Sequence, residues 1–239
     1  MSVNYDINNL VNICGEEKTD VLISYLKEIL EINKFINLTS IRDFDDALLL
    51  HLEDSLSALP EFENAIEGPY LDMGCGGGFP GVPLAVASGR DTTLIDSRTK
   101  KINAVINAIL SNNISSFAKI TLQPIRIEEF SKNHKKEFAI VTARALSSLS
   151  SIIELASPLL KIGGTLICLK GNLDESELQQ AEAIRDDLGY SEFNIRKFYL
   201  SDGVTFREVL SVKKVKNAKI DLPRRDGQAQ NSPLNSNNF

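Results

Sequence analysis

The 239-residue sequence has no tryptophan, and it is poor in cysteine, methionine and histidine. The cysteines are Cys14, Cys75 and Cys168. They are too few and too scattered to predict a disulfide framework or a paired metal-binding motif. The histidines, His51 and His134, are far apart in the sequence. We therefore expect no structural metal site.

Long apolar runs are also missing, since none reaches the roughly 18–20 residues that span a bilayer. The first ten residues lack the basic and then apolar pattern of a secretory signal. Hydrophobic residues make up 43% and charged residues 24%, which predicts a cytoplasmic globular protein with a sizeable core and no membrane contact. The formal net charge of -6, taken alone, argues against a nucleic-acid partner.

Residues 1–60 are predicted to form a helical extension. Apolar side chains recur at helical spacing between Val21 and Leu30. A second amphipathic stretch runs from Phe44 to Leu59, and we expect it to stop at Pro60.

From Gly68 onward, short apolar runs alternate with helical patterns. Strands are predicted at 70–73, 92–96, 119–123, 138–142, 165–169, 193–199 and 207–213. Helices are predicted at 81–88, 98–112, 126–132, 151–160 and 174–187. This alternation predicts a doubly wound α/β domain over 61–213, with a mostly parallel seven-stranded sheet.

Residues typical of helix ends and turns refine the predicted boundaries of these elements. Ser151 and Asp174 each precede a glutamate by three residues, as helix-capping residues do. Gly163-Gly164 is predicted to end a helix. The turn at residues 201–203 predicts one antiparallel strand at the end of the sheet. Residues 214–239 are polar and are predicted to form a poorly ordered basic tail.

A glycine-rich segment joins the first predicted strand to the next helix, which is the context that a nucleotide-binding loop requires. It reads DMGCGGGFPG from residue 72, with glycines at Gly74, Gly76 and Gly78. Phe79 stands where a dinucleotide fingerprint has its third glycine. The Asp72 carboxylate suits a ligand carrying an ammonium and a sulfonium better than a pyrophosphate. The pattern Asp-x-Gly-x-Gly-x-Gly is similar to the first motif of class I S-adenosylmethionine-dependent methyltransferases.

The second predicted strand ends in Asp96. An acidic side chain at this place can accept hydrogen bonds from ribose hydroxyls. The alternative interpretation makes Asp96 the cap of the helix at 98–112. With the glycine loop present, we favour the ribose role.

Further segments closely resemble the RsmG (GidB) family of small-subunit ribosomal RNA methyltransferases, over roughly residues 20–215. In order they are Asn37-Leu38-Thr39-Ser40, His51-x-x-Asp54-Ser55-Leu56, Asp72 through Pro83-Leu84, Leu94-Ile95-Asp96-Ser97, Ala143-Arg144-Ala145 and Leu169-Lys170-Gly171. The loop extension Phe79-Pro80-Gly81-Val82-Pro83 is the most specific part. Cys75 and Gly77 depart from the usual residues.

The resemblance implies a Rossmann-like, bacterial enzyme that methylates N7 of a guanine in the 530 loop of 16S rRNA. The implied cofactor is S-adenosyl-L-methionine. The resemblance also implies that the cofactor site is lined by Gly74, Phe79, Ile127, Glu128 and Arg144.

The residues fit methyl transfer to guanine N7, although the sequence identifies no certain catalytic group. Neither Cys75 nor Cys168 has a neighbour that would activate it as a nucleophile. The Asn/Asp-Pro-Pro-aromatic segment of amine methyltransferases is absent after the fourth predicted strand, where Thr142-Ala143-Arg144-Ala145 stands. Guanine N7 already exposes a lone pair, so orientation alone can promote the transfer.

Three residues are candidates for positioning. Arg144 could hold the methionine carboxylate or a phosphate, or it could form a salt bridge with Glu128 or Asp72. His51 and Asp54 lie one helical turn apart and either pin the helix to the core or face the substrate cleft.

Positive charge gathers locally despite the acidic total, and a local patch can bind phosphate. We predict RNA contacts from the helix after the second strand and from the tail, at Arg98, Lys100, Lys101, Lys213, Lys214, Lys216, Lys219, Arg224 and Arg225. Guanine N7 lies in the deep groove of A-form RNA, so the target base must be unpaired or splayed out. Recognition of RNA shape, within a small-subunit assembly, is the expected mode.

Three alternatives stay open. One is a methyltransferase acting on another RNA base, a protein or a small molecule. The second is a nicotinamide-dependent oxidoreductase, against which Asp72 and Phe79 argue. The third is a non-catalytic RNA-binding module that shares the fold.

Overall fold

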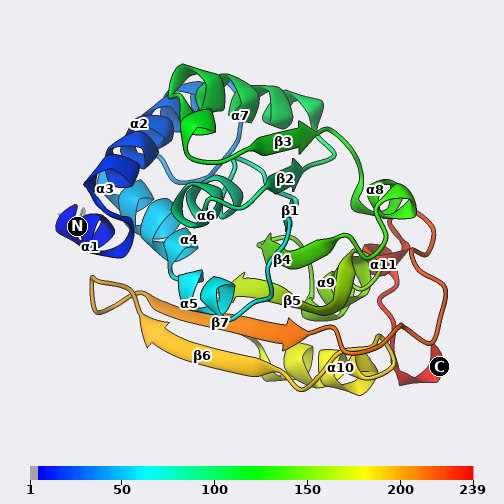
Figure 1. The fold of residues 1–239 in the computed structure, drawn as a ribbon. Coiled ribbons are helices and arrows are strands. Elements are labelled where there is room, and N and C mark those ends of the chain that lie inside the picture. Colours follow the sequence, from blue (N-terminus) through cyan, green and yellow to red (C-terminus); the bar gives the residue numbers. More distant parts are fainter. Residues whose placement is uncertain (1–4, 239) are drawn as a thin grey trace.

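The computed structural model describes residues 5–238 and centres on one seven-stranded sheet (Figure 1). The strand order is β3-β2-β1-β4-β5-β7-β6. The strands are β1 (Tyr70–Met73), β2 (Thr92–Ile95), β3 (Ile120–Gln123), β4 (Phe138–Arg144), β5 (Leu160–Lys170), β6 (Asn194–Tyr199) and β7 (Phe206–Lys213). Neighbours from β3 to β5 pair in parallel, and β7 is antiparallel to both β5 and β6. The predicted doubly wound, mostly parallel sheet is confirmed.

Helices cover both faces of the sheet (Figure 1). They are α6 (Gly81–Ser88), α7 (Thr99–Ser111), α8 (Ile127–Asn133), α9 (Leu149–Ala156) and α10 (Glu175–Arg185). Each face of the sheet packs against its own layer of helices, and successive strand residues alternate between the two faces. Tyr70 of β1 packs with Leu84 of α6, whereas Leu71 packs with Ile152 of α9. Both faces are therefore apolar, as parallel strands require.

The β6–β7 hairpin contains the single antiparallel strand that the sequence predicted. The turn at Ser201–Gly203 joins the strands, and Leu200 N–H is bonded to Thr205 O. However, β7 lies one strand in from the edge, and β6 forms the edge itself.

The N-terminal part is helical, as predicted, but its second stretch is broken. The helices are α1 (Asn8–Cys14), α2 (Glu16–Asn33), α3 (Phe44–Ala47), a π-helical segment (Leu48–Glu53), α4 (Asp54–Leu56) and α5 (Leu59–Glu63). The predicted stop at Pro60 is wrong, because Pro60 lies in the first turn of α5. A proline is tolerated there, since first-turn N–H groups have no partner within the helix.

Two other local predictions are corrected. Ser148, not Ser151, caps α9: its side chain accepts from Ser151 N–H. Gly163-Gly164 lies inside β5 and does not end a helix. A Cβ on Gly164 would lie 3.0 Å from the carbonyl oxygens of Phe138 and Lys161, so close backbone approach explains this glycine. The Asp174 cap of α10 is confirmed, with bonds from Ser176 and Glu177 N–H.

The prediction of a poorly ordered tail is wrong for residues 214–238. Leu222, Ala229 and Leu234 are buried in the core that contains α9. Ala229 belongs to a short helix, α11 (Gln228–Asn231), which packs on α9 (Figure 1). The three apolar residues are spread through a polar sequence, so composition alone concealed them. None of the helices within residues 5–238 is long and apolar enough to cross a lipid bilayer.

Candidate active site

A cavity of about 770 Å³ opens at the carboxyl ends of the parallel strands. Its wall is formed by the loops that follow β1, β2, β3, β4 and β5, together with residues 38–41, 50, 51 and 54 of the N-terminal part. The chain reverses its direction of travel across the sheet between β1 and β4. Ligands of open α/β sheets bind at such a switch point.

The glycine loop after β1 supplies one side of the cavity. Gly74 has φ +72°, and a Cβ there would lie 2.5 Å from the Leu146 side chain. Gly76 has φ +54°, and within residues 5–238, its two chain neighbours aside, a Cβ at this position would meet only Lys101 Nζ, at 4.0 Å. Glycine is needed for conformation at both positions, and at Gly76 the backbone is open to a ligand.

Asp72 and Gly78, which were predicted to contact the cofactor, are not among the residues that line the cavity. Thr142 Oγ1 donates to one Asp72 oxygen at 2.7 Å, and Gly81 N–H donates to the other at 3.0 Å. Burial raises the pKa of Asp72 to about 6. A Cβ on Gly78 would collide with the Tyr25 hydroxyl. Both residues support the conformation of the loop from the side that faces away from the cavity.

Asp96 lies on the cavity wall at the end of β2. Its carboxylate accepts from Gly76 N–H at 3.1 Å and from Arg98 N–H at 2.8 Å. Arg98, not Asp96, occupies the cap position of α7. Asp96 therefore ties the glycine loop to the start of α7, at a place where a ribose could reach it.

Ile127 and Glu128 line the cavity at the start of α8. The buried Glu128 carboxylate accepts a hydrogen bond from Gly227 N–H at 2.6 Å. Gln230 of the tail also reaches the cavity wall. This contribution could not be predicted from the sequence, since about 100 residues separate the tail from α8.

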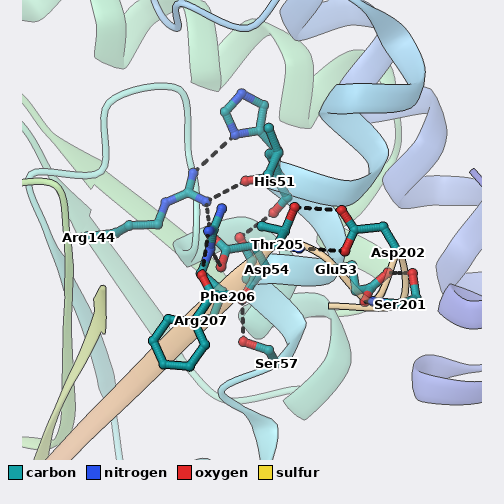
Figure 2. A network of polar contacts seen from close by, with 12 residues as sticks. His51, Glu53, Asp54, Ser57, Arg144, Ser201, Asp202, Thr205, Phe206 and Arg207 are labelled. Atoms are coloured by element: carbon teal, nitrogen blue, oxygen red, sulfur yellow. Dashed lines mark hydrogen bonds and ion pairs between the residues drawn. The ribbon is translucent and has the colours of Figure 1, made fainter. Parts of the chain in front are cut away.

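Arg144 joins β4 to the N-terminal helices (Figure 2). Its guanidinium donates to Asp54 Oδ2 and Leu50 O, both at 2.9 Å, and to His51 Nδ1 at 3.2 Å. Arg207 of β7 donates to the second Asp54 oxygen at 2.8 Å. The partner of Arg144 is thus Asp54, and neither Glu128 nor Asp72. His51 and Asp54 both pin the helix and line the cavity.

His51 is held in one orientation. Its ring stacks on Phe79, with centroids 4.6 Å apart and planes 7° from parallel. Burial, reinforced by the charge of Arg144, lowers the pKa of His51 to about 3. The imidazole is therefore neutral near pH 7.

Cys75 and Cys168 lie in surroundings that disfavour the thiolate form. Burial raises the pKa of Cys75 well above its ordinary value and that of Cys168 to about 12. Neither thiol forms the thiolate that a nucleophile requires.

The predicted RNA contacts divide into two groups. Arg98 and Lys101 line the cavity, and Lys100, Lys213 and Arg225 are exposed. The other four tail residues are engaged within the protein. Lys214 is buried, with its ammonium on Ser157 Oγ and Leu188 O. Lys216, Lys219 and Arg224 pair with Asp186, Asp187 and Glu154. Of the predicted tail contacts, only Lys213 and Arg225 are therefore exposed without an ion pair among the described residues.

The cavity wall nevertheless carries more positive than negative charge. Its cationic residues are Arg98, Lys101, Arg126, Arg144, Lys170 and Arg207, and its acids are Asp54, Asp96 and Glu128. Sequence reasoning missed Arg126, Lys170 and Arg207. Lys170 stands in the Leu169-Lys170-Gly171 segment of the family resemblance, whereas Arg126 and Arg207 have only a position near the end or the beginning of a strand, which many surface residues share.

Together, the doubly wound sheet, the glycine loop after β1 and the acid after β2 define a class I S-adenosylmethionine-dependent methyltransferase. An S-adenosylmethionine-dependent O-methyltransferase from Thermotoga maritima has the same fold, with a TM-score of 0.55 and 15% identity, covering 80% of this chain and 73% of the other. An S-adenosylmethionine-dependent methyltransferase from Methanosarcina mazei matches with a TM-score of 0.52 and 19% identity, covering 65% and 97% of the two chains.

Sequence comparison narrows the class. The family model described as rRNA small subunit methyltransferase G matches residues 18–199. Curated relatives of that name from Clostridium beijerinckii (32% identity, 92% of each chain) and Lachnoclostridium phytofermentans (34% identity, 88% of this chain and 87% of the relative) extend the match. The chain belongs to the rRNA small subunit methyltransferase G family, and its cofactor is S-adenosylmethionine.

Proposed function

We propose that this chain transfers a methyl group from S-adenosylmethionine to N7 of a guanine in the 530 loop of 16S rRNA. The observation that carries the proposal is the chemistry of the cavity in a chain of this family: the wall is cationic, and its residues His51 and Asp54 are unsuited to removing a proton from an acceptor.

The described side chains next to the glycine loop support an acceptor that needs no deprotonation. Asp54 is held between two guanidinium groups. His51 has ring contacts at both nitrogens and a strongly lowered pKa. An amine or hydroxyl acceptor must lose a proton, whereas guanine N7 presents a lone pair. The work of the site is then alignment of the acceptor, which can supply several kcal/mol.

The cofactor, when bound, supplies an electrophilic methyl carbon on a sulfonium. We propose that the backbone around Gly74 and Gly76 accommodates it, with Asp96 accepting from the ribose hydroxyls. The remaining proposed contacts are Phe79, Ile127, Glu128 and Arg144. The open backbone at Gly76 and the carboxylate at Asp96 fit a ligand with hydroxyl groups and a positive centre.

The RNA substrate fits the cationic wall. We propose that Arg98 and Lys101, on the cavity wall at the start of α7, neutralise phosphates around the acceptor nucleotide. Because N7 lies in the deep groove of an A-form helix, the base has to leave the stack to enter the cavity. We propose that the substrate is an assembled or partly assembled small subunit, whose shape presents this base.

The test is mass spectrometry of 16S rRNA from cells that lack the gene. Loss of one 7-methylguanosine from the 530 loop, restored by the wild-type gene and not by a gene carrying Asp96→Ala, supports the proposal. Unchanged rRNA overturns it and favours another acceptor. Binding of RNA by the purified protein without release of S-adenosylhomocysteine would favour a non-catalytic RNA-binding module.

A further inference from the structure

The Thr39 hydroxyl lies on the cavity wall, in the segment between α2 and α3. Its oxygen has two contacts. Ile41 N–H donates to it at 3.1 Å, and His51 Nε2 lies 2.8 Å away.

The direction of the His51 contact is set by Arg144. A guanidinium has N–H groups only and cannot accept, so His51 Nδ1 must be the acceptor of their hydrogen bond. Since the lowered pKa keeps the ring neutral, its single N–H is on Nε2. His51 therefore donates to Thr39 Oγ1.

Both lone pairs of the Thr39 oxygen are thus occupied, and its own hydrogen is left over. Within residues 5–238, no group accepts that hydrogen. A hydroxyl ordinarily donates and accepts. This one is restricted to donation, and it lies on the wall of the cavity.

The segment around Thr39 is held firmly. The Asn33 amide oxygen accepts from Leu38 N–H at 2.7 Å and from Thr39 N–H at 3.0 Å, and its nitrogen donates to Thr39 O at 2.9 Å. The stacking of His51 on Phe79 fixes the other side of the contact. The hydroxyl is therefore preorganised before any ligand enters.

We infer that Thr39 selects the acceptor base, by donating a hydrogen bond to the O6 carbonyl of guanine. This inference rests on the proposed function. The guanine edge that carries N7 also carries O6, an acceptor, whereas the matching edge of adenine carries an amino donor at N6. A hydroxyl that can only donate accommodates guanine and leaves two donors facing each other when adenine enters. Sites built around such a bond reject ligands that lack the partner.

The uncharged character of this donor matters for the reaction. Methylation at N7 leaves the guanine with a positive charge, which a cation at O6 would oppose. Arg144 is linked to Thr39 through the neutral His51 ring, so the group that donates to O6 is an uncharged hydroxyl. The Thr39 hydroxyl can thus orient the base without itself adding a charge at O6.

The test compares wild type with Thr39→Val, which removes the hydroxyl at nearly constant volume, and with Thr39→Ser, which keeps it. The substrates are small ribosomal subunits from cells lacking the gene, reconstituted with guanine or adenine at the acceptor position. Transfer of radiolabelled methyl gives kcat/KM for each. Calorimetric titration with S-adenosylhomocysteine reports whether the cofactor site is intact.

For Thr39→Val we expect kcat/KM on guanine subunits to fall by about 10- to 100-fold, and the preference for guanine over adenine to shrink by a similar factor. For Thr39→Ser both quantities should stay within about threefold of wild type, because the donor remains. S-adenosylhomocysteine affinity should be unchanged in both variants. A purely structural role would lower activity without altering the guanine preference.

Two outcomes overturn the inference alone. One is a Thr39→Val enzyme with the wild-type guanine preference, and the other is a Thr39→Ser enzyme as impaired as Thr39→Val. A wild-type protein that methylates no small subunit overturns the proposed function, and this inference with it.

Discussion

The backbone N–H of Gly227 donates a hydrogen bond of 2.6 Å to the carboxylate of Glu128, 99 residues earlier in the chain. This bond connects the C-terminal tail to the first turn of α8, whose residues Ile127 and Glu128 line the cavity. Arg224 adds a second fastening, with two nitrogens on the two oxygens of Glu154 at 2.7 and 2.6 Å. The tail is therefore part of the folded domain.

We predict that Arg224→Met destabilises the protein by about 3 kcal/mol, because the buried Glu154 is left without its cation. Arg225→Met is the matched control, since Arg225 is exposed and forms no ion pair in the described chain. It should change the free energy of unfolding by less than about 0.5 kcal/mol. Urea denaturation followed by circular dichroism measures both. Equal effects would show that the tail is not held through Glu154.

A pH dependence follows from Asp72. Burial raises its pKa in the folded protein from the ordinary 3.8 to about 6, so the folded state binds this proton more tightly than the unfolded state. Stability contributed by the neutral carboxyl is present below about pH 4 and is lost as pH rises through 6. The difference amounts to about 3 kcal/mol.

Asp72→Asn isolates this contribution, because the amide has nearly the same shape and no charge in this pH range. Denaturation of both proteins from pH 4.5 to 7.5 should show wild type losing stability relative to the variant as pH rises. A constant difference across this range would contradict the raised pKa.

Cofactor affinity should depend on Asp96. We predict that Asp96→Ala weakens S-adenosylhomocysteine binding by about 10- to 100-fold, because a ribose acceptor and the tie to Gly76 are both lost. Asp91→Ala is the control. Asp91 is an exposed acid just before β2, at the opposite end of that strand. Isothermal titration should find its affinity unchanged, and equal affinities for all three proteins would exclude Asp96 from the site.

RNA binding should respond to charge at the start of α7. We predict that the double variant Arg98→Gln, Lys100→Gln raises KM for small subunits and lowers the salt dependence of binding by about one to two counterions. S-adenosylhomocysteine affinity is the internal check on the cofactor site. Lys119→Gln serves as control, since Lys119 precedes β3, away from the carboxyl ends of the strands. If the double variant and the Lys119→Gln control both show the wild-type salt dependence of binding, the RNA does not contact the start of α7.

The sequence was sufficient for the features that are local. The glycine loop stands between one strand and one helix, so Gly74, Gly76 and Phe79 could be placed on the cavity wall from ten consecutive residues. Asp96 followed from its position at the end of the next strand. The strand pattern predicted the sheet for the same reason, because period and turn residues act over short distances.

Features made by distant segments could not be predicted. The Asp54 carboxylate joins Arg144 of β4 to Arg207 of β7, and only the folded chain brings these three together (Figure 2). The ion pairs of the basic tail could not be predicted for a related reason. Its charges are visible in the sequence, whereas the acids that neutralise them, such as Glu154 and Asp187, lie on other elements.

The contact between α2 and the glycine loop has a practical consequence. Tyr25 donates its hydroxyl to Gly77 O at 2.8 Å, and the same ring leaves no room for a side chain at Gly78. Deleting the first helices to obtain a minimal catalytic fragment would therefore remove Tyr25 and the contacts that hold the glycine loop in its conformation. A fragment beginning near residue 61 should be inert toward ligands even though every ligand-facing residue of the loop is retained.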